Sequence, residues 1–151
     1  MSTAQVSQEL SRNFHFLWDN FPFPVMLVRK DRTVLDRNKA AEAVGCTPGT
    51  RCRDVGQKED HVGCLANEAL REQAAKRVVG YVPLLGKVLD TYWIPVAGHE
   101  DLYLHFSVDI TEYAAERLLP AGCVKGVLPE ELGCAEPCGG GADLYCSQAN
   151  R

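Results

Sequence analysis

The stretch Leu102-Tyr-Leu-His-Phe-Ser-Val-Asp-Ile110 alternates apolar and mostly polar side chains without a break. One face would carry Leu102, Leu104, Phe106, Val108 and Ile110, and the other would carry Tyr103, His105, Ser107 and Asp109. Strict alternation over this length is typical of a β-strand with one buried face. The run ends in Asp109-Ile-Thr-Glu112, which predicts that a new helix begins there and extends to about Leu119.

A second informative stretch lies near the start of the chain, from Phe23 to Asn38. It predicts a strand over 25–29, a turn over 30–32 and a second strand over 33–37. Asn38 is a good N-cap for a short helix over 39–44, which Gly45 ends. We expect this stretch and the strand at 102–110 to form the opening and closing strands of one sheet.

The segments between and around these strands complete the predicted fold. Apolar residues at helical spacing predict an amphipathic helix over about 4–20. A helix over 65–73 and strands over 77–84 and 88–96 follow, with a turn at 98–101. The fold class is therefore α+β, with five strands, short helices and an N-terminal helix. Trp93 and Phe106 should lie on central strands, with Phe106 facing the cavity or the core.

Composition and charge narrow the range of partners. The chain has 151 residues, a formal net charge of −4 and an isoelectric point near 5.5, with no long basic run. Binding to nucleic acid or to an anionic membrane is therefore not expected. The sequence shows no signal-peptide pattern and no apolar run of membrane-spanning length, which predicts a cytoplasmic protein. The apolar surface of the N-terminal helix predicts a homodimer.

Seven cysteines are many for such a chain, and in a reducing compartment they favour metal binding or redox chemistry over structural disulfides. A glycine-rich, charged insert over 46–63 precedes the helix at 65–73. Four ligand-type side chains lie in or next to it and suit tetrahedral zinc or an iron–sulfur cluster: Cys46, Cys52, His61 and Cys64. Two alternatives stay open, a redox thiol pair and small buried apolar residues.

A second group of cysteines lies in the last thirty residues, which are rich in glycine and proline and poor in apolar residues. It consists of Cys123, Cys134, Cys138 and Cys146. Such a segment cannot bury a core of its own. We expect either a small metal knuckle or redox switch, or a disordered Cys-rich tail.

The order of these elements resembles the PAS domain family of sensor modules over about residues 20–117. The resemblance rests on Phe23-Pro-Val-Met-Leu-Val followed by Lys-Asp-Arg-Thr, on Asn38-Lys-Ala-Ala-Glu, and on Asp109-Ile-Thr-Glu112. It implies a five-stranded antiparallel sheet with helices on one face that enclose a ligand cavity. The expected organisation is an N-terminal helix over 1–20, a PAS-like sensor domain over 21–118 and a Cys-rich tail over 119–151.

One PAS subgroup carries Gly-x-x-Cys followed by Cys-x-x-Cys before a helix. Gly49-Thr-Arg-Cys52 matches the first part, whereas His61-Val-Gly-Cys64 places histidine where the subgroup has cysteine. The flavin-binding branch is not favoured, because no Asn or Gln occurs from Ala74 to Ser147 to bond a flavin edge. Haem is a weaker alternative to zinc or a cluster, with histidines 61, 99 and 105 as its candidate ligands.

The resemblance implies a stand-alone sensory or regulatory module in signal transduction. It would sense a small ligand, a metal or redox state through its cavity or through the Cys/His insert. We expect no catalysis, because the sequence shows no phosphate-binding loop, kinase signature or nucleophile elbow. The alternatives are a small metal or iron–sulfur electron-transfer protein, and a thiol redox protein that works through Cys52 and Cys64. The downstream partner is not identified by the sequence.

Overall fold

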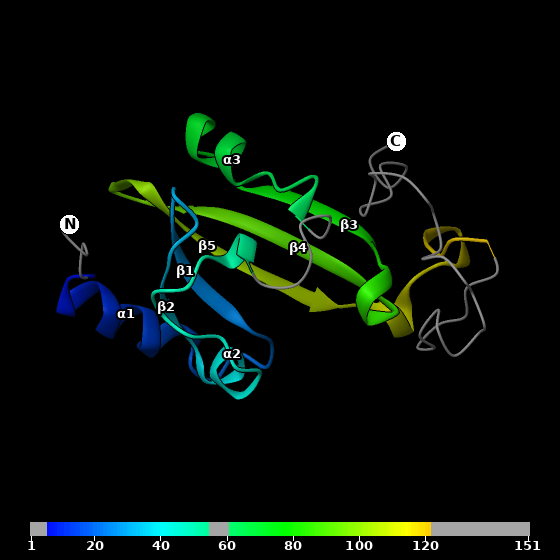
Figure 1. The fold of residues 1–151 in the computed structure, drawn as a ribbon, viewed down its shortest axis with the longest axis horizontal. Helices are drawn as coiled ribbons and strands as arrows, with labels where there is room; N and C mark the ends of the chain where they lie inside the picture. The colour runs from blue at the N-terminus through cyan, green and yellow to red at the C-terminus, as the bar shows by residue number, and fades with distance from the viewer. Residues whose placement is uncertain (1–5, 55–60, 122–151) are drawn as a thin grey trace. The chain divides into compact units, whose positions relative to one another are not determined.

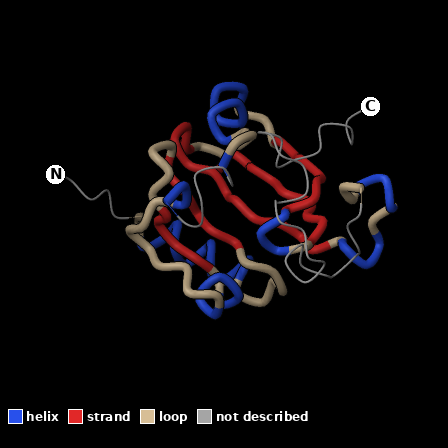
Figure 2. Tube along the Cα trace, turned by 45° about the vertical axis from the view of Figure 1, so that its right-hand side comes forward, coloured by secondary structure: helices blue, strands red, loops and turns tan. Residues whose placement is uncertain are grey.

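A computed structural model describes residues 6–54 and 61–121 (Figure 1). Its strands form one five-stranded sheet in the order β2-β1-β5-β4-β3. The strands are β1 (Val25–Arg29), β2 (Val34–Arg37), β3 (Lys76–Val82), β4 (Lys87–Val96) and β5 (His99–Asp109). The α-helices are α1 (Gln8–Trp18), α2 (Lys39–Ala43) and α3 (Ala66–Glu72), which Figure 2 shows as blue segments among the red strands.

The predicted pairing of the opening and closing strands is confirmed. β1 runs antiparallel to β5, with Val25 opposite Phe106 and Val28 opposite Tyr103. β1 also pairs antiparallel with β2, and a bulge shifts the register between Leu27 and Val28. β5 is therefore the central strand of the sheet, with two strands on each side of it.

The central position of β5 corrects one expectation from the sequence. Alternation predicted that Tyr103 and its neighbours would lie on a solvated face, yet Tyr103 is only 1% exposed and Leu102 beside it is also buried. Both faces of β5 are covered at this point. Tyrosine and histidine are amphipathic, so a strand that buries them on its second face looks half-solvated in a simple polar and apolar pattern.

Local capping determines where the helices begin and end. The Ser7 hydroxyl accepts a hydrogen bond from the Leu10 amide at 3.2 Å and begins α1. The side chain of Asn38 does the same for α2 through the Ala41 amide, as predicted. Gly45 then ends α2 with φ of +85°, a conformation that glycine adopts without strain.

The turn between β1 and β2 is built from charged side chains. Asp31 accepts two bonds from the Arg29 guanidinium, at 3.1 and 2.8 Å, and one from the Thr33 amide at 3.0 Å. The hydrogen bond with Arg29 holds the pKa of Asp31 well below its usual range. Arg32 occupies the left-handed region with φ of 75°, which is uncommon for a residue with a Cβ atom.

The first part of the predicted insert is not a free loop. Gly49 and Cys52 donate backbone hydrogen bonds to the carbonyls of Val34 and Arg32, at 2.8 and 2.9 Å, and Val34 donates to Thr50 at 2.8 Å. Thr33 also forms an isolated antiparallel bridge with Arg51. Residues 49–52 therefore pair with residues 32–34, at the start of β2.

Contacts between residues divide the chain into two compact units. Of the described residues, the first unit holds the segments 6–54, 65–76 and 92–107, and the second holds 61–64, 77–91 and 108–121. In the second unit, Tyr81, Val88 and Ala114 form a small buried cluster. The Thr111 hydroxyl accepts from the Val88 amide at 3.0 Å and donates to Asp109 at 2.6 Å.

The prediction of an α-helix from Thr111 to Leu119 is wrong. Two short 3-10 helices occupy the region, Thr111–Tyr113 and Glu116–Leu118. The backbone is extended at Ala114 and Ala115 between them. The N-cap residue of the first of these helices is Ile110, which makes no side-chain capping bond. Asp109 accepts a hydrogen bond from the Thr111 amide at 3.1 Å, and Thr111 is also held by β4, but no α-helix follows.

Three other boundaries differ from the sequence prediction. The N-terminal helix covers 8–18 and not 4–20 within the described residues, and β5 begins at His99 where a longer turn was expected. Pro83 ends β3, because it starts a 3-10 helix over 83–85. No helix in the described part of the chain is long and apolar enough to span a membrane.

Candidate functional site

Aromatic side chains from the C-terminal end of α1 and from the sheet form a cluster around Phe106 in the first unit. The ring of Phe106 lies 5.5 Å from Trp18, 5.6 Å from Phe21 and 5.0 Å from Tyr92, with the Tyr92 ring stacked on it at 16°. Phe106 is 9% exposed. The prediction that Phe106 faces the core from a central strand is confirmed, and its partners show that α1 belongs to that core.

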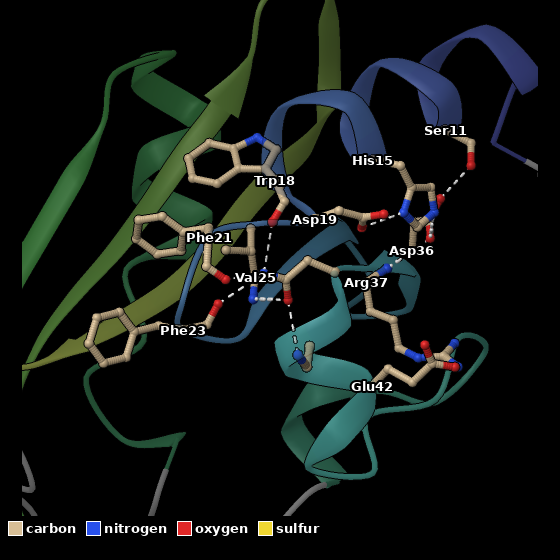
Figure 3. A network of polar contacts seen from close by, with 12 residues as sticks. Ser11, His15, Trp18, Asp19, Phe21, Phe23, Val25, Asp36, Arg37 and Glu42 are labelled. Carbon is tan, nitrogen blue, oxygen red and sulfur yellow. Dashed lines mark hydrogen bonds and ion pairs between the residues drawn. The ribbon is translucent and has the colours of Figure 1, made fainter.

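Asn38 joins α2 to the segment between α1 and β1 by hydrogen bonds, and Figure 3 labels its partners Trp18, Phe23 and Val25. Its amide nitrogen donates to the carbonyls of Trp18 and Phe23, at 3.0 and 2.9 Å, and more weakly to that of Phe21 at 3.4 Å. Its oxygen accepts from the Val25 and Ala41 amides, both at 2.9 Å. The side chain is 1% exposed, so one residue satisfies several buried backbone groups at once.

The opposite face of β5 presents a different set of side chains. Tyr103 and His105 alternate with Leu104 and Phe106 and therefore point to the second face. The Trp93 ring stacks on His105 with centroids 5.2 Å apart and an angle of 18° between the planes. Trp93 is 2% exposed and Tyr103 is 1% exposed. This face therefore carries large rings with polar atoms near the centre of the sheet.

Arg32 connects this second face to α3. Its guanidinium carbon lies 5.9 Å from the centre of the Tyr103 ring, in cation–π geometry. The same guanidinium donates to Asn67 Oδ1 of α3 and to the Lys30 carbonyl, each at 3.0 Å. A positive group thus lies at one end of the Tyr103, His105 and Trp93 face.

The environment of His105 identifies its tautomer. Nδ1 lies 3.0 Å from the Tyr92 carbonyl oxygen, which only accepts hydrogen bonds. Nδ1 therefore carries the proton, and in the neutral ring the lone pair is on Nε2. A stacked indole, an imidazole of defined tautomer, a phenol and a guanidinium are the groups that recognise flat molecules bearing hydrogen-bonding atoms.

The structure describes all four residues of the predicted metal site. Cys46 and Cys52 belong to the first unit, and His61 and Cys64 belong to the second. Within residues 6–54 and 61–121, no three His, Cys, Asp or Glu side chains form a group that could hold a metal ion. Zinc or iron–sulfur binding by these residues, with haem as the weaker alternative, stays a prediction.

The individual cysteines give further detail. Partial burial raises the pKa of the Cys46 thiol, although the charge of Arg37 acts in the opposite direction. Without a metal, the Cys46 thiol therefore loses its proton less readily than an ordinary cysteine, and the deprotonated thiolate is the form that acts as nucleophile or metal ligand. The second predicted group, with Cys123, Cys134, Cys138 and Cys146, lies outside the described residues.

Sequence reasoning missed the most distinctive polar contacts of this unit. Arg32 was assigned to a turn, and its approach to Tyr103 depends on a left-handed backbone that no local pattern predicts. His105 was considered only as a candidate haem ligand. The one signal for its stacking on Trp93 was that both residues lie on neighbouring predicted strands at positions away from the apolar face.

Comparison with known proteins identifies the fold. No family model and no curated protein matches the chain. Among solved structures, the sensory box sensor histidine kinase from Vibrio cholerae has a TM-score of 0.50 and 18% sequence identity, covering 62% of this chain and 83% of that one. A domain of an HTR-like protein from Haloarcula marismortui has a TM-score of 0.49 and 24% identity, covering 59% and 98%.

A third solved structure is the complex of phage VqmA with DPO, with a TM-score of 0.52 and 17% identity. The match covers 74% of this chain and 61% of VqmA, so this chain spans less than two thirds of that protein. At these identities the likeness concerns the fold, and the chain has the PAS-type fold that its sequence resembles.

Proposed function

We propose that this chain is a sensory module of signal transduction that binds a small, flat, polar molecule at the half-buried His105, whose neighbours Tyr103 and Trp93 on the same face of the sheet are buried. The observation that carries the proposal is the stacking of Trp93 on His105, with Nδ1 of His105 bonded to the Tyr92 carbonyl. Burying imidazole and phenol groups costs free energy unless they form hydrogen bonds. Titratable side chains in such an environment are therefore often part of a binding or catalytic site.

Two further observations support this proposal. The PAS-type fold is shared with a sensory box histidine kinase, and VqmA, which has the same type of fold, is described in complex with DPO. The Arg32 guanidinium over Tyr103 would favour a ligand with a carbonyl or an anionic oxygen at one end. Signal would then leave through α1, whose Trp18 packs on the reverse face of β5.

A thermal-shift screen with small nitrogen heterocycles and aromatic carboxylates tests the proposal. A ligand at about one hundred times its Kd stabilises the folded state by about 2.7 kcal/mol. In a domain of this size, that raises the Tm by roughly 10 °C. The shift should disappear in His105→Leu and persist in His99→Leu, because His99 is exposed at the start of the same strand.

Two results would argue against this function. One is a stabilising compound whose effect is equal in His105→Leu and in the wild-type protein. The other is a screen, together with native mass spectrometry of freshly purified protein, in which no compound binds. Because the His105 ring stacks on Trp93, a ligand that contacts His105 should also change the tryptophan fluorescence, which gives a second readout that does not depend on stability.

We also propose a homodimer that forms through α1. Phe16 and Leu17 are adjacent large apolar residues on this helix and are 87% and 69% exposed, although Phe14 on another side of the helix is buried. Exposed apolar residues that cluster on one helix are typical of an interface. A second copy of α1 would cover them by an isologous contact.

A further inference from the structure

His15 of α1 lies between two carboxylates (Figure 3). Its Nδ1 is 2.8 Å from Oδ1 of Asp19, at the C-terminal end of the same helix, and its Nε2 is 3.0 Å from Oδ1 of Asp36 in β2. The hydroxyl of Ser11, one turn earlier on α1, donates to the other oxygen of Asp36 at 2.6 Å. Ser11 and His15 together therefore attach α1 to β2 through one aspartate.

This geometry specifies the charge of the imidazole. A carboxylate oxygen only accepts hydrogen bonds, and a neutral imidazole has a single N–H to donate. Both contacts are made at hydrogen-bond distance, so both ring nitrogens must carry protons. His15 also lies in the last turn of α1, where the helix dipole favours a positive charge.

The electrostatic surroundings agree with this assignment. The hydrogen bond with Asp19 raises the pKa of His15 above 6.5, partial burial opposes it, and the charge of Asp36 adds to the increase. No cation competes for these carboxylates in the contacts made by the described residues: Arg37, next to Asp36, pairs with Glu42 of α2 at 2.8 Å. Arg12, three residues before His15 on α1, is exposed.

The other contacts that hold α1 involve groups that do not change charge near neutral pH. Phe14 is buried, the Trp18 ring packs on Phe106 at 5.5 Å, and the Trp18 carbonyl accepts from Asn38. These contacts hold the C-terminal half of the helix. The contact between His15 and Asp36 is thus the link from α1 to β2 whose strength depends on proton concentration.

We propose that Ser11, His15 and Asp36 form a proton-controlled latch that sets how firmly α1 is attached to β2. When His15 is protonated, it donates to both Asp19 and Asp36 and α1 is bound to β2. Loss of the proton leaves a nitrogen lone pair facing a carboxylate oxygen, so one of the two contacts must break. This proposal goes beyond ligand sensing and does not depend on it, because the latch and the His105 face involve different residues.

The direction of the pH dependence follows from linkage. The pKa of His15 in the folded protein is raised, so its stabilising contribution is complete below the unfolded value of about 6.5. It is lost as the pH rises through the higher folded value. We therefore expect α1 to be held firmly below pH 6.5 and to loosen as the pH rises through the raised pKa of His15.

A pH titration followed by NMR spectroscopy tests the latch. The four histidines of the chain are to be observed individually through their ring signals, and α1 through its amide signals and the Trp18 indole. The expected result is that His15 titrates above pH 6.5 and that the α1 signals follow the same midpoint. In Asp36→Asn, the midpoint should fall towards 6.5, whereas Asp54→Asn, which changes an exposed carboxylate, should leave it unchanged.

His15→Gln supplies a second variant, because glutamine can bond to either aspartate but cannot carry the charge. Its α1 signals should lose the pH response of the wild-type protein, while the far-UV circular dichroism at pH 6 is retained. The proposal is overturned if His15 titrates at or below 6.5, if Asp36→Asn leaves its midpoint in place, or if His15→Gln keeps the same response of α1 to pH.

Discussion

Replacing Asn38 should be the most damaging single polar substitution in the first unit. The side chain makes four hydrogen bonds of 2.9–3.0 Å to the backbone and a weaker one at 3.4 Å, all in a buried position. Each such bond contributes about 1 kcal/mol net, so Asn38→Ala should cost about 4 kcal/mol. The lost cap of α2 is part of this sum.

Asn38→Asp gives a sharper version of the same test. The aspartate keeps an acceptor for the Val25 and Ala41 amides but turns an oxygen towards the carbonyls of Trp18 and Phe23. At pH 7 it should therefore be at least as destabilising as Asn38→Ala. The buried carboxyl would have its pKa raised above the ordinary value of about 3.9. Its penalty should shrink as the pH falls through that raised value, since the protonated acid donates again.

Urea unfolding followed by circular dichroism measures both effects, with each variant compared with the wild-type protein at pH 7 and at pH 5. Asn20→Ala is the matched control, because Asn20 is exposed and its replacement should stay within about 0.5 kcal/mol. A loss below about 1 kcal/mol for Asn38→Ala would refute the reasoning. So would an Asn38→Asp penalty that does not depend on pH.

Four further predictions concern separate parts of the chain. Phe106→Ala should cost about 3–5 kcal/mol in denaturant melts, because its ring is buried among three others, whereas Tyr113→Ala at an exposed site should cost little. Thr111→Val should cost about 1–3 kcal/mol by leaving the Val88 amide without its acceptor, and Thr111→Ser should restore most of that loss. Light scattering of the full chain at tens of micromolar should show a dimer that Phe16→Glu dissociates; a wild-type monomer would contradict the α1 interface. Elemental analysis of freshly purified protein should find zinc or iron that Cys64→Ala lowers, and metal-free protein would end the prediction of a metal site.

The sequence contained enough local information to predict the strands, the caps and the pairing of β1 with β5. Alternation over 102–110 and the cap at Asn38 are properties of short segments, and both are present in the structure. The two 3-10 helices after β5 could not be predicted in this way. Thr111 is held by the Val88 amide of β4, which is 23 residues away in the sequence.

The functional residues were harder to identify for the same reason. The pairing of His15 with Asp19 is visible at i,i+4 spacing, but Asp36 completes the contact from another element. Tyr103 and His105 were read as a solvated face, because alternation cannot show that the other side of a central strand is also covered. The cysteines stood out by number, whereas convergence of side chains on a metal depends on loop geometry that composition does not contain.

The pairing of residues 49–52 has a consequence for self-association at high protein concentration. β2 is an outer strand of the sheet, and an outer strand with unsatisfied backbone groups is a template for strand addition by another molecule. Here Gly49, Thr50 and Cys52 bond to the backbone of residues 32–34 and cover the start of that edge. Any modification of Cys52 that pulled this segment away would therefore uncover a surface on which other copies could polymerise.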